Sequence, residues 1–246
     1  RISVVSWLSS LVMLLRSIHG VFMRLVLFLI ANLISFNIHA LLPPGHVEFD
    51  DLESKTAGGL SRYVIRVTGN IAFPMADEID QIFSAKIPMV RSHVILHLNS
   101  GGGALDEGLK IISLLEERKK IHNVVTTVRN GEMCGSMCVP IFMVGVKRFA
   151  AVTAAFMFHG VTKFHSNVPD QERTRHWLSN VMVPQGVSEE WLQGLWAKGV
   201  FSTPGEYWMT GKELLDEKSG VITDIMDRHV KLEPVELPFD PQIRSR

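Results

Sequence analysis

The sequence predicts an α/β fold in which a mostly parallel β-sheet is flanked by helices. Two observations support this class: apolar segments rich in β-branched residues alternate with amphipathic segments, and a run of glycines links one such strand to the next helix. Strands that alternate with helices are typical of βαβ units, in which neighbouring strands run parallel.

The expected elements begin near residue 63. Residues 63–69 have the composition of a strand, and residues 105–120 place Leu105, Leu109 and Leu115 on one helical face with charged residues elsewhere. We expect strands at residues 63–69, 93–98, 124–128, 156–159 and 221–225, a short apolar segment at residues 149–152, and helices at residues 76–86, 105–120 and 210–216.

Composition divides the 246 residues into four segments. Residues 1–40 are apolar and lack acidic residues, residues 41–58 are predicted to be a linker, residues 59–230 a domain with a substantial core, and residues 231–246 an extended tail. The apolar run after Arg24 and the small residue Ala40 fit a cleaved secretory signal peptide, with an uncleaved membrane anchor as the alternative. We therefore expect the protein to be exported, periplasmic or secreted, or tethered to a membrane.

Charge and cysteine content argue against several classes of protein. The chain has 25 basic and 25 acidic side chains and a formal net charge of +0, so no charge excess favours a nucleic-acid partner. Two cysteines are too few for a disulfide-rich scaffold. The histidines are scattered without a zinc-binding motif, and we expect neither a metal ion nor another cofactor.

Residues 99–103 (Asn-Ser-Gly-Gly-Gly) lie between an expected strand and an expected helix. Glycines let backbone amides approach a ligand without obstruction by a Cβ atom, and a helix start adds positive dipole potential. The segment could be a phosphate cradle, an oxyanion hole or only a tight turn. Neither a dinucleotide-binding nor a P-loop fingerprint is present.

Ser136 and His159 are the candidate nucleophile and base. Gly135 permits a sharp turn that exposes Ser136 at the start of a buried helix, although a serine there can also be an N-cap. His159 ends an apolar strand, where a buried structural histidine is the alternative. An imidazole that takes the hydroxyl proton, with fixed amides that stabilise an oxyanion, is the chemistry of acyl transfer.

Together these motifs resemble the ClpP/crotonase superfamily, which includes signal-peptide peptidase A, and most closely the proteolytic subunit of the Clp protease. The resemblance covers roughly residues 60–227 and rests on residues 99–103, Ser136-Met137, Arg148-Phe149, Met157-x-His159 and the segments 206–214 and 220–224. It implies the superfamily's repeated ββα spiral, with a mostly parallel sheet flanked by helices. It also implies a Ser136 nucleophile, a His159 base and an oxyanion hole formed by the amides of Gly102 or Gly103 and Met137.

The resemblance implies Glu206 as the acid of the triad, if Trp208 is the aromatic residue that follows the family's aspartate. Glutamate is one methylene longer, so its carboxylate needs a different rotamer to reach His159. Asp170 and Glu172 are alternative acids, and a solvated surface glutamate is the alternative role for Glu206.

Three further features separate this chain from the family or leave its chemistry open. Gly101 stands where the family has proline, and the spacing from Gly131 to Ser136 is one residue longer than usual. A serine–lysine dyad, as in signal-peptide peptidase A, would need Lys147 or Lys163, for which solvated lysines are the simpler interpretation.

Cys134 and Cys138 flank Ser136 at a spacing of four residues. On a helix their Cβ atoms would be about 5–6 Å apart, more than the about 3.8 Å that a disulfide prefers. We therefore expect two buried thiols, with a disulfide or a cysteine nucleophile as alternatives.

The function expected from these features is a serine peptidase that hydrolyses extended or unfolded peptides, with a homo-oligomer as a possible assembly. An ATP-driven unfoldase is not expected as a partner, because an exported protein would work without ATP. Membrane contact would come through the N-terminal segment if it is not cleaved. A catalytically inactive binding or assembly protein and a crotonase-like acyl-CoA enzyme are the alternative functions.

Overall fold

The computed structural model describes residues 44–57, 60–163, 166 and 168–226. They belong to the compact unit that begins at Pro44. The expected signal peptide or anchor at residues 1–40 and the expected tail at residues 231–246 lie outside the described residues. Within the described part of the chain, no helix combines the length and apolar character needed to cross a membrane.

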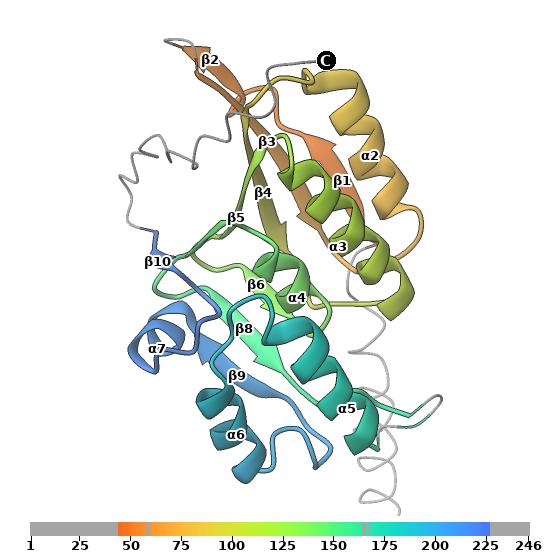
Figure 1. The fold of residues 1–246 in the computed structure, drawn as a ribbon, viewed down its shortest axis with the longest axis vertical. Coiled ribbons are helices and arrows are strands. Elements are labelled where there is room, and N and C mark those ends of the chain that lie inside the picture. Colours follow the sequence, from red (N-terminus) through yellow and green to blue (C-terminus); the bar gives the residue numbers. More distant parts are fainter. Residues whose placement is uncertain (1–43, 58–59, 164–165, 167, 227–246) are drawn as a thin grey trace, which may run out of the picture. The chain divides into compact units, whose positions relative to one another are not determined.

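A seven-stranded sheet forms the centre of this unit (Figure 1). Its neighbouring parallel strands are β3 (Leu60–Thr68), β4 (His93–Asn99), β5 (Asn123–Val128), β7 (Lys147–Ala150) and β10 (Asp224–Ile225). Two further strands, β1 (His46–Phe49) and β2 (Lys55–Ala57), pair antiparallel with β3. The predicted class is confirmed: the fold is α/β with a mostly parallel sheet.

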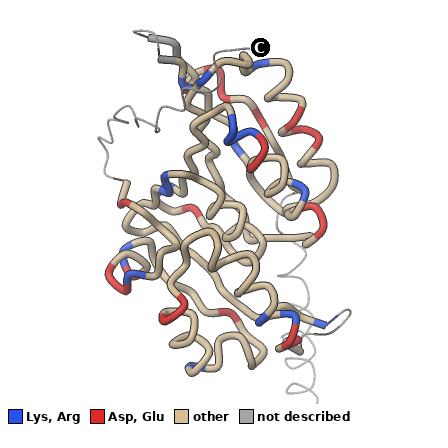
Figure 2. The backbone as a smooth tube through the Cα atoms, viewed as in Figure 1, with Lys and Arg blue, Asp and Glu red and all other residues tan. Residues whose placement is uncertain are grey.

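Three helices cover one face of this sheet: α2 (Met75–Lys86), α3 (Leu105–Lys119) and α4 (Cys138–Met143) (Figure 1). Alternate residues of the strands point toward them, and Leu96 and Val124 pack with Ile111 of α3 in the core without measurable exposure. The outer faces of α2 and α3 carry lysine, arginine, aspartate and glutamate, with both signs of charge interspersed (Figure 2).

A smaller sheet contains β6 (Met133–Gly135), β8 (Ala155–Phe158) and β9 (Tyr207–Thr210). Ser100, at the end of β4, joins the two sheets: its amide donates to the Met133 carbonyl at 2.9 Å, and its carbonyl accepts from the Gly135 amide at 2.9 Å. The glycine turn after β4 therefore lies against the segment that carries Ser136. The remaining helical elements are α5 (Gln171–Trp177), the π-helical η2 (Leu178–Met182), α6 (Glu189–Ala197) and α7 (Gly211–Asp216).

The segment predicted to be a linker, residues 41–58, is partly structured. It contains β1 and β2, and Val47 of β1 is only 9% exposed because it packs into the core. The linker prediction was wrong for these strands. Proline and glycine at residues 43–45 are typical of a turn and led to the linker interpretation. β1 is stabilised by pairing with β3, and local composition does not reveal that pairing.

Candidate active site

Ser136 lies in the turn between β6 and α4. Its φ angle of 49° is in the left-handed region, which residues other than glycine rarely adopt. The Ser136 amide donates to the Met157 carbonyl of β8 at 2.9 Å, which holds the turn against the smaller sheet. The N-cap of α4 is Met137, and no side chain caps this helix. Ser136 is therefore not the cap of the helix that follows it.

The Ser136 hydroxyl and the His159 imidazole are hydrogen-bonded. His159 Nε2 lies 2.8 Å from Ser136 Oγ, and His159 Nδ1 lies 2.7 Å from the Gly160 carbonyl oxygen. A carbonyl can only accept, so Nδ1 carries the proton and donates it to Gly160. Nε2 is then the unprotonated nitrogen that accepts from the serine hydroxyl, which is the tautomer that a general base requires.

The glycine turn packs directly against Ser136. Gly102 and Gly103 have φ angles of 109° and 152°, and a Cβ atom on Gly102 would lie 2.6 Å from Ser136 Cβ. The Gly102 amide donates to Ser100 Oγ at 3.1 Å. Among the described residues, the amides of Gly103 and Met137 have no acceptor. Of the two glycines expected at the oxyanion hole, Gly103 is the one whose amide is available.

Glu206 is not hydrogen-bonded to His159. Its exposed carboxylate accepts from the Trp208 indole at 3.1 Å, and the Nδ1 proton that it was expected to bind is donated to Gly160. Asp170 caps α5 by accepting from the Arg173 amide, and Glu172 is exposed on the first turn of that helix. Within the described part of the chain, none of these three carboxylates contacts the imidazole.

Glu206 and His159 are the residues that directly precede β9 and directly follow β8. In the antiparallel pair of β8 and β9, Met157 lies opposite Trp208 and Phe158 lies opposite Tyr207. Extending this pairing by one residue puts Glu206 opposite His159, on the same face of the sheet as Trp208. Side chains directly opposite in an antiparallel pair have Cβ atoms about 4.5–5.5 Å apart.

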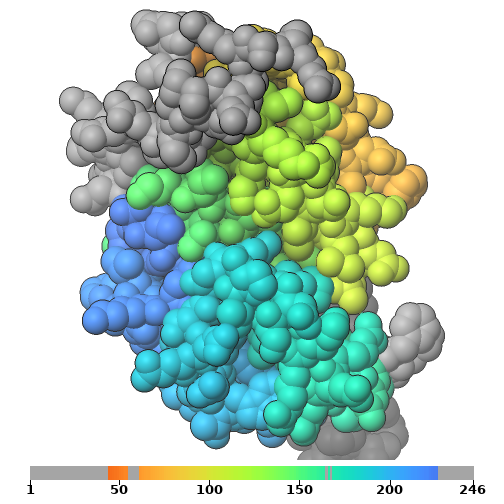
Figure 3. Space-filling model, in the orientation of Figure 1, coloured from red at the N-terminus to blue at the C-terminus, as the bar shows by residue number. Residues whose placement is uncertain are grey.

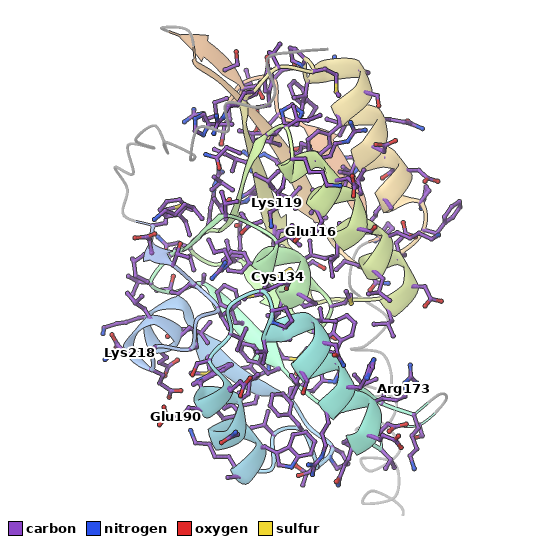
Figure 4. The ribbon with its side chains drawn as sticks, viewed as in Figure 1. Glu116, Lys119, Cys134, Arg173, Glu190 and Lys218 are labelled. Carbon is purple, nitrogen blue, oxygen red and sulfur yellow. A yellow bond between two sulfur atoms is a disulfide. The ribbon has the colours of Figure 1, made fainter. Side chains whose placement is uncertain are left out.

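Cys134 and Cys138 form a disulfide across the Ser136 turn, and neither sulfur is exposed. Figure 4 labels Cys134 in the middle of the molecule, beside α4. The expectation of two thiols is wrong because Cys134 belongs to β6 rather than to a helix, so the spacing of helical neighbours does not apply. The two Cα atoms are 5.2 Å apart, within the usual disulfide range.

The two lysines considered for a serine–lysine dyad do not pair with Ser136. Lys147 forms an ion pair with Asp224 at 3.5 Å on neighbouring strands β7 and β10. Lys163 lies in the loop after β8, on the wall of the same cavity as Ser136, but the serine hydroxyl is bonded to His159.

A cavity of about 490 Å³ opens over the Ser136–His159 pair. Its walls come from the glycine turn, the start of α3, α4, the loop after β8 and α5. In the space-filling view α5 (teal) lies beside the yellow-green segment of α3 (Figure 3). No cluster of three metal-ligating side chains occurs among the residues that the structure describes.

Three residues at the site were not identified from the sequence. Arg173 and Trp177 line the cavity from α5, a helix that no expected element covered. The buried Ser100 hydroxyl fixes the glycine turn. A signal for Ser100 exists in the sequence, since a serine two residues before a glycine is typical of a turn closed by a hydroxyl.

The fold and the site together define an α/β protein with a serine–histidine pair beside a glycine-rich turn, an arrangement typical of serine hydrolases. The sequence profile of the Clp protease family matches residues 55–181, just over half of the 246 residues. The chain belongs to the Clp protease family, a family of peptidases. The match includes Ser136 and His159 and ends before Glu206. No curated protein sequence matches the chain significantly.

Proposed function

We propose that this protein is a serine peptidase in which Ser136 is the nucleophile and His159 is the general base. The observation that carries the proposal is the 2.8 Å contact between Ser136 Oγ and His159 Nε2, within a chain of the Clp protease family. The unprotonated Nε2 takes the hydroxyl proton as Ser136 attacks the peptide carbonyl, and returns it to the departing amine. Water then hydrolyses the acyl-enzyme with the same base.

The oxyanion of each tetrahedral intermediate is stabilised by the Gly103 and Met137 amides. Support comes from their lack of another acceptor within the described residues and from the packing of the glycine turn against Ser136. Each such donor contributes about 3–4 kcal/mol to stabilisation of the transition state. Fixed amides need no reorganisation when charge develops.

Glu206 is the proposed acid of the triad. The pairing of β8 with β9 supports this role, because its continuation by one residue would put Glu206 opposite His159. Substrate binding is the proposed event that moves the carboxylate from Trp208 to Nδ1. In the unbound enzyme the Gly160 carbonyl orients the imidazole instead.

We also propose that the protein works in an exported compartment, or on a membrane through residues 1–40. The buried disulfide supports this proposal because disulfides persist in oxidising compartments. The substrates would be extended or unfolded peptides, and a homo-oligomer is the proposed assembly. An ATP-driven unfoldase is not part of the proposal.

The proposal is tested by intact-protein mass spectrometry after reaction of the full chain with a fluorophosphonate, beside Ser136→Ala and His159→Ala. A single adduct on the wild type that is absent from both variants is the expected result. Hydrolysis of an internally quenched peptide should fall by at least about a thousandfold in both variants. Folded wild-type protein that forms no adduct would overturn the proposal.

One observation favours a second function, that of a binding or assembly protein without catalysis. No carboxylate of the described residues contacts His159, and loss of the acid in a serine–histidine–aspartate triad costs about 10⁴ in turnover. This alternative predicts peptide binding that survives Ser136→Ala and no hydrolysis by the wild type. No comparable observation favours an acyl-CoA enzyme.

A further inference from the structure

The cavity over Ser136 is lined by apolar side chains and by two positively charged ones. Its apolar walls come from Leu105, Met137, Pro140 and Trp177. Its charged side chains are Arg173 of α5 and Lys163 of the preceding loop, and no aspartate or glutamate is among the described residues that line it. A peptide bound beside the nucleophile would therefore meet cations without a compensating protein anion.

Neither cation is paired within the described part of the chain. No ion pair or side-chain hydrogen bond involves the Arg173 guanidinium; Asp170, three residues earlier, accepts instead from the Arg173 backbone amide. Glu172, the other nearby carboxylate, points from the exposed first turn of α5 and does not line the cavity. By contrast Arg175, on the same helix, stacks on the Trp196 ring at 4.5 Å, away from this cavity.

An unpaired guanidinium at the edge of an apolar pocket is chemically suited to bind a carboxylate. Its planar donors bind both carboxylate oxygens at once, and such charge-assisted hydrogen bonds are roughly twice as strong as neutral ones. A few placed polar groups in an otherwise apolar cavity are what orient a bound ligand. Figure 4 shows Arg173 on α5, the element that forms the outer side of the site.

We propose that Arg173, assisted by Lys163, selects peptides that carry a carboxylate close to the scissile bond. This inference rests on the proposed peptidase function and adds the substrate class. The carboxylate is either the side chain of an aspartate or glutamate or the C-terminal carboxylate of a short peptide. Arg173 is the specificity-determining residue because a helix positions it, whereas Lys163 lies in a loop.

The test compares hydrolysis of matched internally quenched peptides by the full-length wild type, Arg173→Gln and the control Arg175→Gln. One pair of peptides differs by glutamate or glutamine next to the scissile bond, and a second pair has a free or amidated C-terminus. We expect kcat/KM to favour the carboxylate in one pair by about tenfold, the low end for a charge-assisted hydrogen bond. The pair that shows the preference identifies the source of the carboxylate.

Arg173→Gln should abolish the preference while hydrolysis of the neutral peptides continues, and Arg175→Gln should keep it. The preference should also weaken at high salt because the cations are exposed to solvent. Equal rates for both members of each pair in the wild type, with fluorophosphonate labelling of Ser136 intact, would overturn the substrate class and leave the peptidase proposal standing.

A binding measurement covers the case in which the peptidase proposal itself fails. Fluorescence polarisation with the same peptides and Ser136→Ala reports binding without turnover. Tighter binding of the carboxylate peptide that disappears in Ser136→Ala/Arg173→Gln supports the cationic site. Equal binding of all four peptides contradicts it.

Discussion

At the scale of single residues, the proposed mechanism requires a group that stabilises the charged imidazole. His159 donates from Nδ1 to the Gly160 carbonyl, a neutral acceptor, whereas Glu206 is engaged with Trp208. A carboxylate stabilises an imidazolium more strongly than a carbonyl does. The position of the Glu206 side chain therefore decides between an efficient triad and a slower dyad.

The first prediction concerns Glu206. Glu206→Gln should lower kcat toward peptides by up to about 10⁴, because an amide does not stabilise the imidazolium as an anion does. Glu172→Gln, an exposed carboxylate on α5, is the matched control and should leave kcat unchanged. Steady-state kinetics check both. A Glu206→Gln enzyme with wild-type kcat would show that the pair acts without this acid.

The second prediction concerns Ser100, a positioning residue. Its hydroxyl accepts from the Gly102 amide, so Ser100→Ala releases the turn that presents the Gly103 amide. We expect kcat to fall about tenfold to a hundredfold with little change in KM, because a displaced oxyanion donor affects the transition state more than the substrate. Ser202→Ala, in the loop after α6, is the control. A rise in KM alone would indicate a role in substrate binding instead.

At the scale of elements, the junction of β6 and α4 depends on a covalent link. The Cys134–Cys138 disulfide connects the middle residue of β6 to the first residue of α4, and Ser136 with its left-handed φ lies between them. Because the link spans the turn, it restricts the conformations that the nucleophile can adopt.

The third prediction follows from this link. Cys134→Ala/Cys138→Ala should lower the free energy of unfolding by about 2 kcal/mol, since closing so short a loop removes little chain entropy. Urea denaturation monitored by circular dichroism measures the change. We also expect a lower kcat in the folded double variant, because the Ser136 turn is less restricted. An unchanged denaturation midpoint would contradict a stabilising role for the link.

At the scale of the whole molecule, one buried and one half-buried histidine make the stability of the fold depend on pH. His122 is 1% exposed, packs on Phe83, and has a buried Nδ1 without a hydrogen-bond partner among the described residues. Burial, with a smaller contribution from the charge of Arg118, lowers the pKa of His122 below its ordinary value. Partial burial also lowers the pKa of His93.

The fourth prediction is the resulting pH dependence. Well above pH 6.5 these histidines are neutral in both states, and as the pH falls the unfolded chain binds protons that the folded protein does not. Stability should therefore fall below about pH 6.5, by at most about 1.4 kcal/mol per pH unit for each histidine. Urea midpoints between pH 5 and pH 8 check this. His122→Phe should reduce the slope, and the exposed-site control His46→Gln should not.

Much of the fold and part of the site could be predicted from local sequence. The strands near residues 63–69 and 93–98 and the helix near residues 105–120 were confirmed within a few residues, because apolar periodicity reports which face of an element is buried. The glycine turn, Ser136 and His159 were recognised from spacing, and the structure brings Ser136 and His159 into hydrogen-bond contact.

The tertiary structure decided what depends on contacts between distant segments. β1 needs β3 as its partner, a strand that begins more than ten residues further along the chain. The disulfide forms because Cys134 belongs to a strand, whereas its sequence spacing suggested a helix. Sequence alone determined the class of fold and singled out Ser136 and His159 as the candidate pair, because periodicity and motif spacing are local. The hydrogen-bond and strand partners of these residues follow from packing, which only the folded chain defines.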